Sequence, residues 1–218
     1  MIRTLLISSA YLLVWSLFYH FGQLEWLIQG FPQCCGYWIE SNQILILFLI
    51  MLLAIVNIPV ISPFPHVRIK LNVVGCIVPL LLSCGLYWYC PPLRHLLLLP
   101  VVVAALAGLL CSKLTNQGVF MNIEPLIIIT GVSTIISILW TGHSGYLPWA
   151  PQIAFISAFM GSLLGGDIVR IPLAWIQKRE NAVVTINIGG AGAADALFVA
   201  GLSAGVLTHF GVLLWKII

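Results

Sequence analysis

The chain has 218 residues, of which 61% are apolar and only 7% are charged. Soluble domains carry about 25% charged residues, so this composition could not cover a water-facing surface. In a bilayer the apolar side chains can face the lipid instead. The formal net charge of +3 is small and scattered along the sequence, and it does not indicate nucleic acid as a partner. We therefore expect an all-α, polytopic transmembrane helix bundle that forms a single domain over residues 1–218.

Seven apolar stretches are long enough, or nearly so, to cross a bilayer, which takes about 20 helical residues. They cover residues 4–21, 43–60, 71–89, 96–111, 125–140, 151–168 and 186–215. The first follows a single Arg and lacks a small-residue cleavage site, so we expect a retained first span rather than a signal peptide. The fourth and fifth stretches are short. The seventh is long enough to begin with a non-helical or re-entrant piece.

The basic residues indicate the direction in which these spans run. With the N-terminus in the cytoplasm, seven Lys and Arg residues fall in inside segments and two fall outside. The inside set is Arg3, Arg68, Lys70, Lys113, Arg170, Lys178 and Arg179, and the outside set is Arg94 and Lys216. The positive-inside rule therefore predicts a cytoplasmic N-terminus and an outside C-terminus.

The six cysteines do not form a metal-binding pattern. Three lie within apolar runs and are predicted to be small core residues, namely Cys76, Cys84 and Cys111. The other three fall in predicted outer loops, namely Cys34, Cys35 and Cys90. A disulfide among these three stays open, and unpaired cysteines are the simpler interpretation. The sequence contains no phosphate loop, dinucleotide fingerprint or zinc spacing, so we expect neither a metal nor another cofactor.

Acidic groups at membrane depth direct the search for a functional site, because each costs roughly 2.5–3.5 kcal/mol to insert at the bilayer centre. Of the six acidic residues, four lie in loops or at a span edge, namely Glu25, Glu40, Glu124 and Glu180. Asp167 falls at the cytoplasmic end of the sixth span. Asp195 falls one or two turns into the seventh span from the same side. The two carboxyls therefore share a leaflet, and they can meet if the two helices pack together.

The residues around both acids are small. Gly165 and Gly166 precede Asp167, while the run that leads to Asp195 contains Gly189, Gly190 and Gly192. Small residues spaced four apart let helices approach closely, and the pairs with this spacing are Gly161 with Gly165 and Gly201 with Gly205. Two carboxyls a few Å apart cannot both ionise cheaply, so such a pair shares a proton. One Asp can then activate a water while the other protonates a peptide carbonyl.

Structural roles for these polar residues are the alternative. Asp167 can reach the headgroups directly, or it can form an ion pair with Arg170 three residues along a helix. Asp195 is harder to explain in this way, because its neighbours are Gly, Ala and Leu. Asn57, close to Pro59, can either bind a freed backbone carbonyl or line the site, and so can Asn72, with the structural role favoured. Asn187 is predicted to position the second Asp.

At these residues the chain resembles a known family. Gly165-Gly166-Asp167-Ile168, a basic linker and the glycine-rich run from Ile188 to Phe198 resemble the C-terminal signature of an uncharacterised prokaryotic multi-pass membrane family, the domain of unknown function numbered sixteen-fourteen. The segments Asn57-Ile58-Pro59-Val60 and Asn72-Val73-Val74-Gly75-Cys76-Ile77-Val78-Pro79 are similar to its other two signatures. The resemblance covers most of the chain from the second span onward. It implies a location in a prokaryotic cytoplasmic membrane and no established activity.

A weaker resemblance is to intramembrane aspartyl proteases of the presenilin, signal-peptide-peptidase and prepilin-peptidase type. These place one Asp on an inward helix and a second Asp, in a Gly-x-Gly-Asp motif, on the next outward helix. The predicted topology of Asp167 and Asp195 matches that arrangement. The motif is incomplete, because Ala194 stands where its second Gly is expected and Leu164 stands where the first is expected before Asp167. A Pro-Ala-Leu segment, which the presenilin type uses, is not present.

The leading hypothesis is therefore an intramembrane aspartyl protease that cleaves a transmembrane or signal-type helix with Asp167 and Asp195. Membrane lipids and a transmembrane peptide are the expected partners. One alternative is a small transporter or channel that binds a proton or cation at the Asp pair, which needs a water path to both faces. A second alternative is a non-catalytic scaffold that holds partner helices on its glycine-rich faces.

Overall fold

The computed structural model describes residues 25–29, 49–50, 52–62, 64, 67–115, 118–120, 123–177, 184–189 and 195–215. The first predicted span and most of the second lie outside these residues, so the structure does not test them. The same holds for Cys34, Cys35, Gly190 and Gly192.

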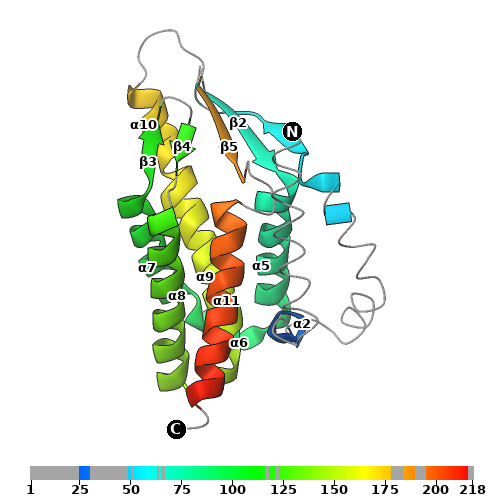
Figure 1. Ribbon diagram of the computed structural model, residues 1–218, viewed down its shortest axis with the longest axis vertical. Coiled ribbons are helices and arrows are strands. Elements are labelled where there is room, and N and C mark those ends of the chain that lie inside the picture. The colour runs from blue at the N-terminus through cyan, green and yellow to red at the C-terminus, as the bar shows by residue number, and fades with distance from the viewer. Residues whose placement is uncertain are drawn as a thin grey trace.

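The described chain is built around helices that run alternately between the two ends of a bundle (Figure 1). These are η1 (Val73–Ile77) continued by α5 (Val78–Tyr89), α7 (Leu98–Cys111), α8 (Ile123–His143), α9 (Ala150–Gly161) continued by η3 (Ser162–Ile168), and α11 (Ala196–Trp215). Shorter helices are α2 (Glu25–Gln29), α6 (Pro91–Leu96), η2 (Leu147–Trp149) and α10 (Arg170–Gln177). The predominantly helical class predicted from composition is confirmed.

Three helical segments are long and apolar enough to cross a membrane, at Leu126–His143, Leu147–Leu173 and Ala196–Trp215. Two further apolar helices are shorter, at Val73–Tyr89 and Leu98–Cys111. Each of the five overlaps one of the stretches predicted as the third to the seventh span. Their length and composition indicate a membrane protein.

Two small β-sheets lie at one end of the bundle (Figure 1). In the first, β2 (Val67–Asn72) pairs antiparallel with β1 (Asn57–Val60) and parallel with β5 (Val184–Ile188). The second is the antiparallel pair of β3 (Lys113–Thr115) and β4 (Gly118–Phe120). The all-α prediction is wrong for these segments, which lie in predicted loops or at the ends of predicted spans. We call this the sheet end of the bundle, and the end that carries α6 the opposite end.

The sheet has a physical cause in the sequence. In β2, Val67 and Ile69 are buried while Arg68 and Lys70 are exposed, which is the period-two alternation of a half-buried strand. β5 repeats the pattern, with Ile186 and Ile188 buried. The seventh stretch therefore begins as a strand, which confirms its predicted non-helical start. In contrast, the second stretch ends in β1 and not in a helix.

α9 is the central helix of the described bundle. Every residue from Ala150 to Phe159 is buried, as expected for a helix that is apolar on all sides. Ala154 and Ala158 pack with two alanines of α11, and Phe155 covers Gly201. α9 and α11 therefore pack together, as the Asp pair requires.

Of the four paired glycines, Gly201 alone contacts the facing helix of the α9–α11 pair, and the other three contact other helices. Gly161 and Gly165 pack against Ala104 and Ala105 of α7. Gly205 packs against Trp26 of α2. These glycines bring α7 and α2 onto the bundle, because a backbone without Cβ atoms lets a neighbour approach closely.

We predict that Gly165→Ala destabilises the fold by about 1–3 kcal/mol, the usual cost of overpacking, because the new Cβ would collide with the Ala105 carbonyl oxygen. Gly131→Ala on α8 is the matched control, since a Cβ there meets nothing within 4 Å. In the control, the loss of backbone freedom should raise stability by roughly 0.5–1 kcal/mol. Reversible unfolding in mixed micelles measures both variants, and equal effects would contradict the packing assignment.

Candidate functional site

Asp167 lies in a π-helical segment, η3, which continues α9 toward the sheet end. The Val169 N–H donates to the Leu164 carbonyl at 3.1 Å, which is a bond between residues five apart. Gly165 and Gly166 are buried in the widened turn, where Gly165 contacts the α7 backbone. π-helical turns are rare and occur frequently at functional sites. Asp167 itself is half-buried.

Arg170 does not neutralise Asp167. Its Nη2 donates to the carbonyls of Leu109 at 2.6 Å and Ser112 at 2.7 Å, and its Nε donates to the Ser112 Oγ at 3.1 Å. The guanidinium therefore caps the C-terminus of α7, where carbonyl groups lack helical partners and attract a cation. The predicted alternative of an Asp167–Arg170 ion pair is wrong, because Arg170 turns toward α7.

Asp195 stands at the start of α11 rather than inside it. Its Oδ1 accepts a hydrogen bond from the Leu197 N–H at 3.0 Å, and its carbonyl accepts the first helical bond from Val199 at 2.9 Å. This is the position of an N-cap, where Asp is favoured. The prediction that Asp195 lies one or two turns into a helix is therefore wrong, because β5 occupies the beginning of that stretch. The positive end of the α11 dipole favours its negative charge.

The structure brings both acids to the sheet end. Leu197, two residues after Asp195, belongs to one buried apolar cluster with Phe159 and Leu163, which lead into η3. Asp167 and Asp195 are close enough for their charges to interact. Both charges also act on the buried thiol of Cys76, which belongs to the same cluster. The two carboxyls that the sequence singled out therefore share one electrostatic environment.

Cys76 was predicted only as a core residue, and its place beside the two acids was missed. It lies in η1, the second π-helical segment, and its exposed fraction is 2%. η1 begins at Asn72, whose Oδ1 accepts from the backbone N–H groups of Val74 at 3.0 Å and Gly75 at 2.8 Å. An Asn directly before an apolar run is a helix-start signal, and it could have identified this turn.

Asn72 also ties η1 to the end of the second stretch. Its Nδ2 donates to the carbonyls of Ala54 at 2.8 Å and Val56 at 3.2 Å, and to the Asn57 Oδ1 at 3.3 Å. Asn72 is fully buried, whereas Asn57 is exposed on β1. The structural role favoured for the two asparagines accounts for all of these bonds.

Gly189 joins the end of β5 to η1. It adopts a φ of 72°, and a Cβ there would lie 2.6 Å from the Gly75 carbonyl carbon and 2.7 Å from the Cys76 nitrogen. Gly75 faces the Gly189 carbonyl oxygen in the same way. Asn187, by contrast, is exposed and pairs in register with Lys70. It lies on the face of the sheet opposite the buried Ile186 and Ile188.

The remaining cysteines differ from one another. Cys90 is buried, and Cys111 is half-buried. Cys84 is exposed, so its prediction as a core residue is wrong; an apolar position on α5 can face lipid as well as protein. Among the described residues, no three His, Cys, Asp or Glu side chains are grouped as metal ligands would be.

Comparison with protein families gives one match. Residues 39–207 match the model of the family described as "Protein of unknown function (DUF1614)". The chain belongs to this family. The match includes both aspartates, both π-helical segments and all three strands of the larger sheet. No curated protein and no solved structure is significantly similar to this DUF1614 member. The predicted family is thus confirmed, and the similarity to aspartyl proteases is not shown.

For this DUF1614 member we predict that Gly189→Ala loosens the junction of β5 with η1. Gly145→Ala is the matched control, because Gly145 has a φ of 76° but open space around it. The control should lose about 1–2 kcal/mol from the left-handed backbone alone. Gly189→Ala should lose about 1–3 kcal/mol more, from overpacking against Gly75 and Cys76. Unfolding measurements with hydrogen exchange at β5 provide the comparison, and equal losses would rule out the close contact.

Proposed function

We propose that this chain is an intramembrane aspartyl protease, or a close relative of one, that cleaves a transmembrane or signal-type helix. The observation that carries the proposal is the approach of Asp167 and Asp195 from neighbouring elements at one end of the bundle, where their charges interact. Arg170 is engaged with α7 and leaves Asp167 available. An acid at this depth is costly, which favours a functional role.

In the proposed reaction the two aspartates share one proton. The ionised carboxyl takes a proton from a water molecule, whose oxygen attacks the peptide carbonyl carbon. The protonated carboxyl gives its proton to the carbonyl oxygen, and a gem-diol forms. As the gem-diol collapses, one of its hydroxyls returns a proton to the second carboxyl, the C–N bond breaks, and the amine leaving group takes a proton from the first carboxyl. The new carboxyl and amino ends of the peptide are then released, and the pair of aspartates regains its original protonation state.

The surroundings of the pair suit an extended substrate. A helical substrate must unwind before its peptide bond is accessible, because helical carbonyls are bonded within the helix. Irregular backbone is tolerated at membrane depth where protein surrounds it, and η1, η3 and the turn at Gly189 are all irregular. We propose that the glycines before both aspartates, which include Gly165, Gly166, Gly189, Gly190 and Gly192, shape the site. Close backbone packing at Gly165 and Gly189 holds the irregular segments in place.

We further propose seven spans in a prokaryotic cytoplasmic membrane, with the N-terminus inside and the C-terminus outside. The charge distribution supports this orientation. Four of the five Lys and Arg residues in the described chain belong to elements at the sheet end, and Arg94 alone belongs to α6 at the opposite end. The sheet end would then face the cytoplasm under the positive-inside rule.

A transporter of protons or cations is the second candidate, and buried hydroxyl groups favour it. Thr130, Ser133 and Ser137 follow one another along one face of α8, and their buried hydroxyl oxygens have no hydrogen-bond partner in the described part of the chain. Ser162 in η3 and Thr208 in α11 share this condition. Buried polar groups of this kind commonly bind internal water. A row of such waters would link the sheet end to the membrane interior.

We predict that Asp167→Asn and Asp195→Asn each abolish cleavage while the fold is kept. Asn also caps helices well, so the second change removes the acid and retains the start of α11. The readouts are cleavage of co-reconstituted single-span peptides and labelling by a photoreactive peptide isostere whose hydroxyl mimics the gem-diol. Both should fall by at least about 10²-fold, the lower range of general acid–base contributions. Glu124→Gln, an exposed acid at the start of α8, is the control and should leave both readouts unchanged.

Other outcomes of that experiment identify the alternatives. Retained cleavage in either Asp variant would contradict the proposed catalytic pair. The transporter would be supported if the wild type cleaves no peptide but carries protons or cations into the same vesicles. This flux should then be lost in both Asp variants. Altered stability or partner binding alone would support the scaffold.

The topology makes a separate prediction. Alkaline phosphatase fused after Ile218 should be active, because that enzyme matures only outside the cytoplasm. A green fluorescent protein fused at the same position and exported through the general secretory route should remain dark. Fusions within the loop between α7 and α8 should give the reverse pattern. The opposite result at both positions would reverse the proposed orientation.

A further inference from the structure

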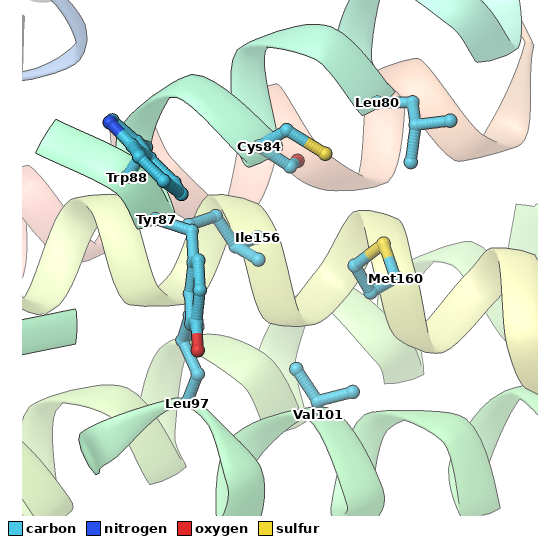
Figure 2. Close-up of a pocket in the computed structure, with 9 residues that line it drawn as sticks. Leu80, Cys84, Tyr87, Trp88, Leu97, Val101, Ile156 and Met160 are labelled. Carbon is cyan, nitrogen blue, oxygen red and sulfur yellow. The ribbon is translucent and has the colours of Figure 1, made fainter. Parts of the chain in front are cut away.

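A groove lies between α5, α7 and α9 (Figure 2), and neither aspartate lines it. Its volume is ≈ 380 Å³. Leu80 and Cys84 of α5 form one wall, Ile156 and Met160 of α9 form the floor, and Val101 of α7 forms the other wall. The groove is therefore almost wholly apolar. Its place on the side of the bundle makes it accessible from the hydrocarbon phase of a bilayer.

Two polar features interrupt the apolar lining near the opposite end. Ser83 lines the groove with an exposed fraction of 4%, and among the residues that the structure describes its Oγ has no hydrogen-bond partner. A buried hydroxyl without a partner costs free energy unless a ligand or a water bonds to it. Tyr87 crosses from α5 toward Leu97 at the end of the groove (Figure 2). The groove thus has a long apolar part and one end with hydrogen-bonding groups.

A cation stands beside that polar end. The Arg94 guanidinium lies 6.0 Å from the ring centre of Tyr87 and 5.9 Å from that of Trp88. Its Nη2 donates to the Trp88 carbonyl at 2.8 Å and its Nε to the Tyr87 carbonyl at 3.4 Å. These bonds fix the guanidinium at the C-terminus of α5. Within the described part of the chain Nη1 makes no hydrogen bond, and Arg94 is exposed.

The aromatic residues indicate the depth of this cation. Trp88 is 70% exposed and Tyr89 is 52% exposed, although both are large and partly apolar. Exposed Trp and Tyr gather at the level of the lipid headgroups. Arg94 therefore lies at headgroup level, and the groove from Tyr87 to Leu80 lies at the level of the acyl chains.

A partner helix and an acyl chain are the two kinds of apolar occupant that a bilayer offers. A helix with its side chains is about 10 Å wide, and a single acyl chain is much narrower. An Arg with free donors binds a phosphate group strongly, through charge-assisted hydrogen bonds.

We propose that this groove is a binding site for one anionic phospholipid. One acyl chain occupies the groove between α5 and α9, the phosphate binds the Arg94 guanidinium, and the Ser83 hydroxyl donates to an ester carbonyl. The proposal is independent of the aspartates and holds whichever activity they support.

A photoactivatable phosphatidylglycerol with a diazirine in its acyl chain tests this site in the full-length protein, reconstituted in phosphatidylcholine. Mass spectrometry should place the crosslinks on the groove residues of α5 and α9. Cys84→Trp fills the groove and should reduce these crosslinks about tenfold. Arg94→Gln removes the cation and should also reduce them about tenfold, because one charge-assisted hydrogen bond to the phosphate is lost. Arg94→Lys keeps the charge and should retain most of them.

Leu110→Trp is the matched control, because Leu110 is 84% exposed on α7 and does not line the groove. It should leave the groove crosslinks unchanged. Crosslinks spread evenly over all exposed apolar helix faces would overturn the proposal, as would equal labelling by a phosphatidylcholine probe. If Arg94→Gln fails to fold, Cys84→Trp still decides, since unchanged groove crosslinks in that variant also refute the site.

Discussion

The candidate site depends on a contact between two backbones at the sheet end of the bundle. Gly189, in a left-handed turn after β5, touches Gly75 and Cys76 in the first π-helical segment. Neither position has room for a side chain, so the end of β5 is held directly on η1. The pairing of β5 with β2 fixes the same strand from its side. Together these contacts determine where the chain re-enters the bundle before Asp195 and α11.

The other acid is positioned by a different close contact. Gly161 and Gly165 let α7 approach the widened end of α9, and Arg170 then caps α7 just beyond Asp167. The guanidinium thus stabilises the helix end and leaves the carboxylate of Asp167 without a counter-charge from that residue. Asp195 gains stabilisation from the α11 N-terminus that Asp167 does not have. The two carboxyls are therefore chemically unequal, which an acid–base pair requires.

The two ends of the bundle carry different kinds of residues. The sheet end carries the acids, the irregular backbone and most of the basic residues that the structure describes. The opposite end carries the exposed aromatic residues and Arg94, beside an apolar groove between α5, α7 and α9. Cys84 illustrates the difference between a membrane and a soluble fold, because an apolar run does not say which side faces protein. The missed strands have a similar origin, since the alternation in β2 merges with the apolar run of the next helix.

The sequence by itself determined the membrane-like composition, the predominantly helical class, the family and the two candidate acids, because composition and rare charged residues are local properties. It also contained the alternation of β2 and the Asn72 start signal, which identify local structure once they are considered. The tertiary structure alone decided that Gly165 faces α7, that Arg170 caps a distant helix, and that Cys76 lies beside both acids. Such pairings join residues far apart in the chain. They follow from which surfaces fit together in space, and no periodicity along one segment encodes that fit.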